Sequence, residues 1–465
     1  MIVMKFGGTS TQDAHAVENV VRIVKARLDR KPIVVISAIA QATNMLERAG
    51  RLASDGRTGD ARSALLALFE RHTAMTDALI KDQQRCQNLR KAISSSLGEL
   101  EEMIKGLAIL RELTPRALDT IYSYGELLSS RIVAVALEEN GVASRWIDTK
   151  EFMVTDDHYN SASPDMELLG TRLSEIMTPL IGQGTVPVTQ GFIGVTRSGH
   201  RTTMGRESSD YSASVIGSVL GVEDIQIWTD VDGILTSDPT VVASPKKVKT
   251  LSFAEAFDLS YFGAKVLHPK TILPAVERNV PIHVYNSRRP ELSGSLITSM
   301  NSSGTPLVKS IAYKRNMAVL AVVPKHRYGQ YIFWDHVYNI LTKHGASASL
   351  TASSEYGLSI VLDQSHELPS IVQGLKEVGS VDLDEGKGII SMVGSNIRSV
   401  PKFMERVFRA VSDYTVAAIS FGASPSSLCI VVDDQSVPSA VESLHREFFD
   451  TVNSDEFEDL RHLPA

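Results

Sequence analysis

The first forty residues constrain the fold most, because they combine the sequence periods of a strand and a helix. Met1–Phe6 is a short apolar run that stops at Gly7-Gly8. Apolar residues then recur at helical spacing from Val17 to Leu28, and Ile33–Ser37 is a second apolar strand. A strand–helix–strand unit of this kind predicts a parallel sheet, whose ligands bind at the carboxyl ends of the strands. Ser10 and Asp13 have the spacing of a capping box at the start of the helix.

The same alternation continues to about residue 305 and predicts one large α/β domain, 1–305. Further strands are expected at Val142–Ile147, Val186–Thr189, Ile225–Thr229 and Ile282–Tyr285. Residues from about 45 to 139 are helix-rich and predict a helical insertion. Asn301–Pro306 is short, polar and contains Gly and Pro, so it is the best candidate for a linker.

The chain after this linker contains an internal repeat. At a constant offset of 70 residues, the matching positions include Val323 and Val393, Phe333 and Phe403, Leu358 and Leu428, and Ile360 and Ile430. Each copy reads strand, helix, strand, strand, helix. The repeat predicts two small ferredoxin-like α+β modules, 306–390 and 391–465, between which strands can be exchanged.

Composition excludes several classes of protein. The chain has 465 residues and a net charge of −7, so we expect several domains and no nucleic-acid partner. It contains no run of about 18 apolar residues and no signal-peptide pattern, so we expect no membrane partner. The only cysteines, Cys86 and Cys429, have no metal-ligand spacing and are typical of a reducing compartment. We therefore expect a cytoplasmic protein.

Three stretches carry residue types that suit a phosphate site: Lys5–Ser10, Thr202–Asp210 and Trp228–Gly233. Lysine and arginine neutralise phosphate charge, an aspartate holds Mg²⁺ or orients the lysine, and glycines let backbone N–H groups approach the oxygens. Lys5 precedes its glycines, so the first stretch is neither a P-loop nor a dinucleotide fingerprint. The set as a whole favours phosphoryl transfer.

Each of these residues also has a simpler interpretation when it is taken alone. Lys5 fits a surface lysine before a turn, and Arg206–Asp210 fits a solvated turn. Thr229-Asp230 fits a plain β-turn, and Lys265 fits a lysine that snorkels out of an apolar stretch. Glu126 would by default be an exposed helix residue. The combination, and no single member, favours a site.

The combined motifs resemble those of the aspartokinases in the amino-acid-kinase family. They occur in the family's order: Lys-Phe-Gly-Gly-Thr-Ser (5–10), Tyr-Gly-Glu (124–126), Thr-Gln-Gly-Phe-Ile-Gly (189–194), Gly-Arg-x-x-Ser-Asp (205–210), Trp-Thr-Asp-Val-Asp-Gly (228–233) and Phe-Gly-Ala-Lys-Val-Leu-His-Pro (262–269). The repeat resembles the paired ACT modules that sense an end-product amino acid. The resemblance implies ATP-dependent phosphorylation of the side-chain carboxylate of L-aspartate, the first step of lysine, threonine and methionine biosynthesis, with feedback regulation.

The resemblance also implies roles for individual residues. Lys5 would stabilise the transferring phosphoryl group, and Asp210 would organise that lysine. L-Aspartate would contact Ser37, Thr43, Glu126, Arg206 and Ser209. ATP would contact Lys5, Gly7, Gly8, Ser10, Thr229, Asp230 and Lys265, with Mg²⁺ bound through ATP and not directly by the protein. An effector, lysine or threonine, would bind near Ser347, Ser353, Ser354 and Glu355. The strand edges that the two modules leave exposed predict a homodimer or homotetramer, in which a second subunit covers them.

Several positions depart from the family pattern. Glu207-Ser208 stands where two small residues are usual, Leu235 where a tyrosine commonly contacts the base, and Thr240 where an arginine is frequent. Ser349 replaces an aspartate of lysine-sensitive enzymes, which leaves lysine and threonine equally open as effectors. Two rival functions remain, another amino-acid kinase and a catalytically weak amino-acid sensor. No homoserine dehydrogenase domain follows, so we expect the monofunctional form.

Overall fold

The computed structural model describes residues 1–205, 207–263, 267–299, 307–325, 329–450 and 455–459. The chain forms two compact units, Met1–Ile234 with Leu267–Ser299, and Leu235–Val266 with Met300–Ala465. This division differs from the single boundary expected near residue 305, because residues 235–266 pack with the C-terminal part. The expected linker, Asn301–Pro306, lies outside the described residues.

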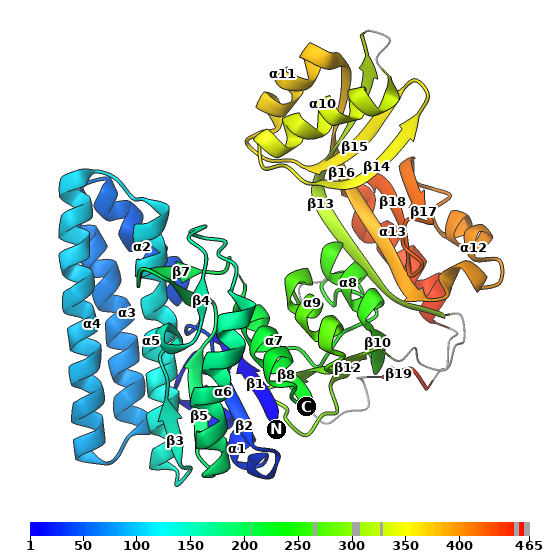
Figure 1. Ribbon diagram of the computed structural model, residues 1–465. Helices are drawn as coiled ribbons and strands as arrows, with labels where there is room; N and C mark the ends of the chain where they lie inside the picture. The colour runs from blue at the N-terminus through cyan, green and yellow to red at the C-terminus, as the bar shows by residue number, and fades with distance from the viewer. Residues whose placement is uncertain (206, 264–266, 300–306, 326–328, 451–454, 460–465) are drawn as a thin grey trace. The chain divides into compact units, whose positions relative to one another are not determined.

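Strands of the first unit lie in a mainly parallel sheet, in the order β12-β11-β8-β1-β2-β5-β3 (Figure 1). Its parallel strands are β1 (Ile2–Phe6), β2 (Pro32–Ile36), β3 (Ser144–Trp146), β5 (Val186–Gln190), β8 (Asp224–Thr229) and β11 (Ile282–Asn286). The last strand, β12 (Ser295–Thr298), runs antiparallel to β11. β1 pairs in parallel with both β2 and β8, so the carboxyl ends of these three strands lie at one edge. The strands expected from the sequence are confirmed.

Helices cover both faces of this sheet. One face carries α1 (Ala14–Lys25) and α5 (Pro115–Glu139), and the other carries α6 (Met166–Gly182), α7 (Ser209–Leu220) and α9 (Pro269–Arg278). The expected helical insertion is confirmed: α2 (Ala42–Ser54), α3 (Thr58–Leu79) and α4 (Gln83–Leu110) pack with α5 as a bundle beside the sheet (Figure 1). A small separate sheet contains β4 (Val154–Thr155), β6 (Ile193–Thr196) and β7 (Arg201–Thr203).

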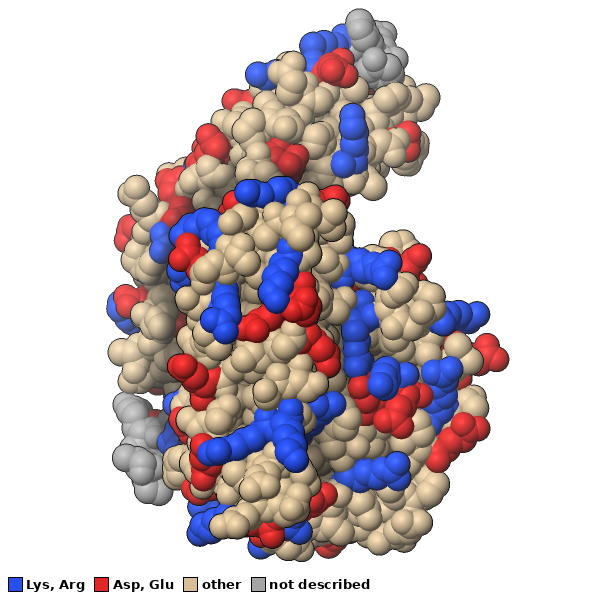
Figure 2. All heavy atoms as spheres, turned by 90° about the vertical axis from the view of Figure 1, so that its left-hand side faces the viewer, with Lys and Arg blue, Asp and Glu red and all other residues tan. Residues whose placement is uncertain are grey.

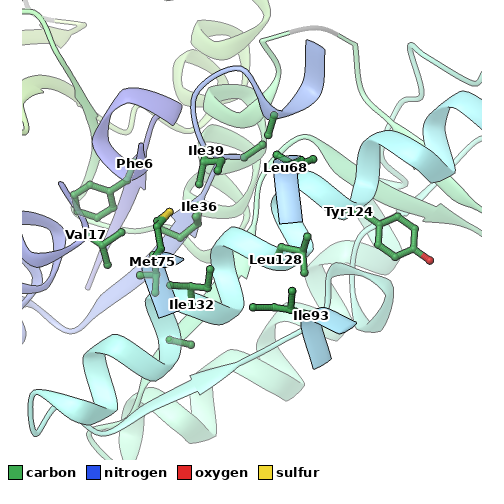
Figure 3. Packing of buried hydrophobic residues seen from close by; sticks show 14 of the residues in the cluster. Phe6, Val17, Ile36, Ile39, Leu68, Met75, Ile93, Tyr124, Leu128 and Ile132 are labelled. Carbon is green, nitrogen blue, oxygen red and sulfur yellow. The ribbon is translucent and has the colours of Figure 1, made fainter. Parts of the chain in front are cut away.

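The hydrophobic core of the first unit joins the sheet to the helical bundle. Phe6 and Ile36 project from β1 and β2 toward Val17 of α1 and toward Leu128 and Ile132 of α5, as Figure 3 shows. All five side chains are buried. The helices are therefore fixed on the sheet mainly by burial of apolar surface, at about 25 cal/mol for each Å².

The expected capping box at the start of α1 is wrong. Asp13 is the N-cap, and its side chain accepts a hydrogen bond from the Ala16 N–H. Ser10 lies in a short 3₁₀ turn, Gly8–Thr11, and is buried at the end of the sheet. The spacing of the two residues was compatible with a cap, but the hydroxyl of Ser10 has tertiary partners that a local pattern cannot reveal.

Two ferredoxin-like modules in the second unit share one sheet, in the order β14-β15-β13-β16-β18-β17. The first part of the repeat contains β13 (Leu307–Pro324), α10 (Gln330–Lys343), β14 (Ala348–Ser354), β15 (Gly357–Asp363) and α11 (Leu368–Val378). The second contains β16 (Gly379–Ser395), α12 (Phe403–Ala410), β17 (Val416–Phe421), β18 (Ser427–Asp433) and α13 (Val437–Phe449). The repeated order of elements is therefore confirmed. β13 and β16 pair from Leu307 to Pro324, so each of these long strands serves both modules.

A buried ion pair explains why residues 235–266 belong to the second unit. This segment contains β9 (Lys247–Val248), β10 (Thr250–Ser252) and α8 (Phe253–Tyr261), and β9 pairs with β19 (Phe457–Glu458). Glu255 in the first turn of α8 lies 3.0 Å from Lys309 Nζ on β13, and both side chains are 1% exposed. Ser395 at the end of β16 donates to Glu255 Oε1 at 2.6 Å. α8 is therefore bound to the two long strands.

Charge on the surface is mixed in sign. On the face drawn in Figure 2, lysine and arginine side chains alternate with aspartate and glutamate, without a continuous basic area. The net charge of −7 agrees with this mixture. No helix in the described part of the chain is long and apolar enough to cross a membrane.

We expect Lys309→Met to destabilise the second unit by about 3–5 kcal/mol, because it leaves the Glu255 carboxylate buried without its cation. The double variant Lys309→Met/Glu255→Gln should recover much of this loss, since a neutral amide replaces the stranded charge. Urea unfolding measures the change in the free energy of unfolding, and hydrogen exchange of the backbone amides of residues 250–261 measures it locally. Lys376→Met, on the exposed surface of α11, is the matched control. Equal stability of Lys309→Met and this control would contradict the account.

Candidate active site

The clearest feature at the carboxyl edge of the first sheet is an ion pair. Lys5, near the end of β1, places its Nζ 2.6 Å from Asp210 Oδ1, and the two side chains are only 10% and 14% exposed. Asp210 lies in the first turn of α7, which begins at Ser209 and packs on β1. The expectation that Asp210 orients Lys5 agrees with this contact, and a surface lysine before a turn does not.

Glycines let the loops after β1 and β2 approach each other. A Cβ on Gly8 would lie 2.9 Å from the Ala38 carbonyl oxygen, which is too close for any side chain there. The Ala40 N–H donates to the Gly8 carbonyl at 3.1 Å, and the Gly7 N–H donates to the Trp228 carbonyl at 3.1 Å. A Cβ on Gly7 would lie 3.4 Å from Lys5 Nζ. The absence of side chains at 7 and 8 therefore leaves space beside the lysine.

Ser10 connects this loop to β8 and to the end of β11. Its hydroxyl lies 2.7 Å from the Ser287 hydroxyl and 3.2 Å from the Trp228 carbonyl oxygen. Ser287 in turn donates to the Thr229 carbonyl at 3.0 Å. Thr229 is half-buried at the end of β8, and Asp230 after it is exposed. The expected ATP contacts Gly7, Gly8, Ser10, Thr229 and Asp230 therefore lie along one connected edge.

Glu126 is buried, so its interpretation as an exposed helix residue is wrong. It is 3% exposed, and its Oε1 accepts the Ala38 N–H at 3.1 Å. Its second oxygen, Oε2, is buried and has no hydrogen-bond partner among the described residues. Burial raises the pKa of Glu126 to about 8, although the Ala38 N–H and the charge of Lys5 act in the opposite direction. This carboxyl group is therefore available to a donor from a ligand.

The other residues expected to bind L-aspartate lie around these groups. Ser37 follows β2, and its carbonyl accepts the Ser129 hydroxyl at 2.7 Å. Ser209 is buried at the start of α7 beside Gly191, where a Cβ would meet the Ser209 Cβ at 2.7 Å. Thr43 is half-buried in the first turn of α2, and no side-chain hydrogen bond joins it to the others among the described residues. Arg206 and Lys265 lie outside the described residues.

The departures from the family pattern have separate local structures. Glu207 is exposed and has a φ of 62°, a left-handed conformation that favours glycine. Thr240 is exposed, and its N–H and hydroxyl both donate to Asp238 Oδ1. Leu235 forms an isolated bridge with Lys247. The usual small residue at 207 therefore has a conformational reason.

The residues expected to contact an effector lie on the second unit. Ser347, Ser353, Ser354 and Glu355 are all exposed. Ser353 and Ser354 end β14, which is an edge strand of its sheet. Ser349 on the same strand lines a cavity of about 340 Å³, together with Asp258 and Ser424. No contact among the described residues joins the four into one pocket.

Sequence reasoning missed three buried polar residues at this edge of the first unit. The Ser287 hydroxyl accepts a hydrogen bond from the Ser10 hydroxyl. Gln190, at the end of β5, accepts the Thr149 N–H. Asp119 on α5 accepts three hydrogen bonds. Asp119 precedes Glu126 by seven residues on the same helix. Two carboxylates at this spacing share one helical face, and that signal could have been used.

Comparison with known proteins identifies the family of this site. The family model described as the amino acid kinase family matches residues 1–286, and a model described as an ACT domain matches residues 390–448. Aspartokinase 3, chloroplastic, of Arabidopsis thaliana is 35% identical over 97% of this chain and 82% of its own length. Lysine-sensitive aspartokinase 3 of Escherichia coli is 31% identical over 97% of this chain and 99% of its own length.

A solved structure agrees with these relatives. The crystal structure of E. coli aspartokinase III in complex with aspartate and ADP has a TM-score of 0.86 and 30% identity. It covers 97% of this chain and 100% of its own. The match therefore extends over both units of this chain. On these grounds the chain belongs to the aspartokinases of the amino acid kinase family.

Proposed function

We propose that the chain transfers the γ-phosphoryl group of ATP to the side-chain carboxylate of L-aspartate. A carboxylate oxygen attacks the γ-phosphorus, the bond to the bridging oxygen breaks, and the products are 4-phospho-L-aspartate and ADP. The observation that carries this proposal is the Lys5–Asp210 ion pair at the carboxyl edge of a parallel sheet, beside the open Gly7-Gly8 loop. Membership in the aspartokinases supplies the acceptor.

Charge neutralisation and positioning account for the chemistry. Lys5 faces the negative charge that develops on the transferring oxygens, and Asp210 keeps the ammonium group in place. Lys5 lies at the end of β1, and Asp210 lies in the first turn of α7. The N-terminus of α7 adds positive potential at this place. The acceptor carboxylate is already ionised at neutral pH, so the step needs no general base.

Glu126 and Arg206 divide the recognition of L-aspartate between its charged ends. The partnerless Oε2 of Glu126 accepts from the substrate ammonium group. Arg206, by its place in the motif, binds the α-carboxylate through both guanidinium N–H donors, which a lysine cannot imitate. Ser37, Thr43 and Ser209 contribute hydroxyl groups. This division leaves the side-chain carboxylate free to react.

ATP and its metal occupy the edge formed by Gly7, Gly8, Ser10, Thr229 and Asp230, with Lys265 as a further phosphate contact. Among the described residues, no three His, Cys, Asp or Glu side chains gather as metal ligands. In our proposal Mg²⁺ would be held by the phosphates of ATP and by water, which is its usual manner of binding in kinases. The metal would neutralise phosphate charge in the reaction.

An end-product amino acid, lysine or threonine, binds near Ser347, Ser353, Ser354 and Glu355 in our proposal. The name of the E. coli relative describes it as lysine-sensitive, while Ser349 here lacks the carboxylate that would favour lysine. β14 is an edge strand with exposed residues, which a second subunit can cover in a homodimer or homotetramer. We place the reaction in the cytoplasm or another reducing compartment, because both cysteines are free.

The function is tested by coupling ADP release to a visible reaction with L-aspartate, L-glutamate and D-aspartate as acceptors. Hydroxylamine added to the assay traps an acyl phosphate as the hydroxamate. We expect one hydroxamate for each ADP with L-aspartate alone. ADP release that does not depend on L-aspartate, or none with any acceptor, rejects the proposal and favours a catalytically weak sensor.

Replacing Lys5 by methionine should lower kcat by at least about a hundredfold, because a preorganised charge at the phosphoryl group is lost. Steady-state kinetics with saturating L-aspartate and MgATP measure the change. Lys25→Met removes a lysine from the exposed side of α1 and is the matched control. Wild-type turnover in the Lys5 variant would exclude the role.

The kcat/KM for L-aspartate should rise between pH 6.5 and 8.5. Glu126 has a pKa of about 8 in the free protein, so it is mostly neutral at lower pH and binds the substrate ammonium group weakly. Glu126→Gln should be slow at every pH and should lose this dependence. A pH profile that is unchanged in the variant would show that another group titrates.

The raised pKa of Glu126 also predicts that stability falls as the pH rises, whereas kcat/KM for L-aspartate rises. A carboxyl group with a raised pKa stabilises the fold below its unfolded pKa, and this contribution is lost as the pH rises through about 8. The Tm of Glu126→Gln should therefore exceed that of the wild type most clearly above pH 8. Thermal melts from pH 5 to 9 measure this difference.

Replacing Glu207 by glycine should leave the KM for MgATP nearly unchanged, because the side chain is exposed. It should raise stability by about 0.5–1 kcal/mol, because the left-handed φ of 62° strains a residue with a Cβ. Ser208→Gly is the matched control, since Ser208 has an ordinary φ of −84° and should gain nothing. A higher metal requirement in the Glu207 variant would instead indicate a role near Mg²⁺.

A further inference from the structure

Asp119 is a buried carboxylate outside the motifs that resemble those of the family. It is 0% exposed on α5, and no lysine, arginine or histidine of the described residues forms an ion pair with it. Its Oδ2 accepts the Asn160 N–H and the Thr203 N–H, both at 2.9 Å. Its Oδ1 accepts the Thr203 hydroxyl at 2.6 Å. One side chain thus binds two segments that are distant in the sequence.

These two segments meet at the residue before Arg206. Thr203 ends β7, and the chain continues through Met204 and Gly205. Gly205 has a φ of 97°, and a Cβ there would lie 3.6 Å from the Asn160 carbonyl oxygen. Asn160 is itself in the left-handed conformation, with a φ of 66°. Two unusual backbone conformations therefore pack against each other, and Asp119 binds the backbone on both sides.

Other contacts limit where this segment can move. The Ala162 N–H donates to the Thr203 carbonyl, and the Met204 N–H donates to the Phe192 carbonyl, both at 2.9 Å. These bonds hold the strand at one edge, and Asp119 connects its last residue to α5 by side-chain hydrogen bonds. α5 also carries Glu126, whose Oε1 is held by Ala38. One helix therefore supports both halves of the acceptor site.

We propose that Asp119 is a positioning residue for the binding of L-aspartate: its carboxylate fixes Thr203 and Asn160 around Gly205, the residue that precedes Arg206 in the sequence. The inference rests on the proposed function, because it assumes that Arg206 binds the α-carboxylate. Asp119 does not touch the substrate. Its effect should therefore appear in the binding of L-aspartate and not in the binding of MgATP.

Replacing Asp119 by alanine removes three hydrogen bonds and should raise the KM for L-aspartate by about tenfold or more, since hydrogen bonds to a charged group contribute strongly. The KM for MgATP should change by less than about twofold. Asp119→Asn should restore the KM for L-aspartate to within about threefold of the wild type. Its amide oxygen can accept both N–H groups, and its NH₂ can donate to the Thr203 hydroxyl.

Two further variants separate positioning from general stability. Thr203→Val removes only the 2.6 Å bond and keeps the branched shape, so it decides the question if the alanine variant does not fold. It should raise the KM for L-aspartate by about threefold with little change in Tm. In a double-mutant cycle, Asp119→Ala should add little to Arg206→Lys, because both act on one interaction.

The outcomes are distinguishable from failure of the proposed function. If the wild-type protein does not release ADP in response to L-aspartate, the function itself is rejected. If it does, equal increases in both KM values, or additive effects with Arg206→Lys, reduce Asp119 to a structural residue and overturn the inference. An unchanged KM for L-aspartate in both Asp119→Ala and Thr203→Val overturns it as well.

Discussion

The ion pair between Lys5 and Asp210 sets the geometry on which the rest of the site depends. It joins the end of the first strand to the first turn of a helix that begins more than two hundred residues later. A lysine that is only 10% exposed needs a partner, because an unpaired charge at this depth is costly. The pair therefore requires α7 to start over β1. The absence of a side chain at Gly7 then leaves space beside the ammonium group.

Under the proposed function, Glu126 weakens the fold in order to bind the substrate. A carboxyl group that is 3% exposed with one partnerless oxygen weakens the folded state near neutral pH. The same desolvation strengthens its attraction for an ammonium group, because charges interact more strongly away from water. The opposite arrangement is seen in the second unit, where Glu255 binds both Lys309 and Ser395, and Lys309 also donates to the Thr250 carbonyl.

Sequence patterns were sufficient where the physics is local or periodic. The apolar runs in β1 and β2, the helical insertion and the repeat with offset 70 were all correctly predicted, since burial produces the 2.0 and 3.6 periods directly. The role of Asp210 beside Lys5 came from the resemblance to the family, since Asp210 lies in the first turn of a helix and the strand pattern alone left its role open. Ser10 was misassigned as a cap, because its partners Trp228 and Ser287 lie far along the chain.

Other features depend on tertiary contacts that no local pattern carries. The assignment of 235–266 to the second unit follows from the burial of Glu255 against Lys309, and neither residue stands out in the sequence. Asp119 was missed although its spacing from Glu126 places both on one face of α5. The signal existed, but only the positions of Thr203 and Asn160 give it meaning.

The central claim is that Lys5 and Asp210 act as one unit in phosphoryl transfer. A double-mutant cycle of Lys5→Met and Asp210→Asn, followed by the rate of aspartyl hydroxamate formation at saturating substrates, tests it most directly. The account predicts strong non-additivity: once Lys5 is gone, the loss of Asp210 should cost almost nothing further. Fully additive effects would mean that the two side chains act independently and would contradict the account.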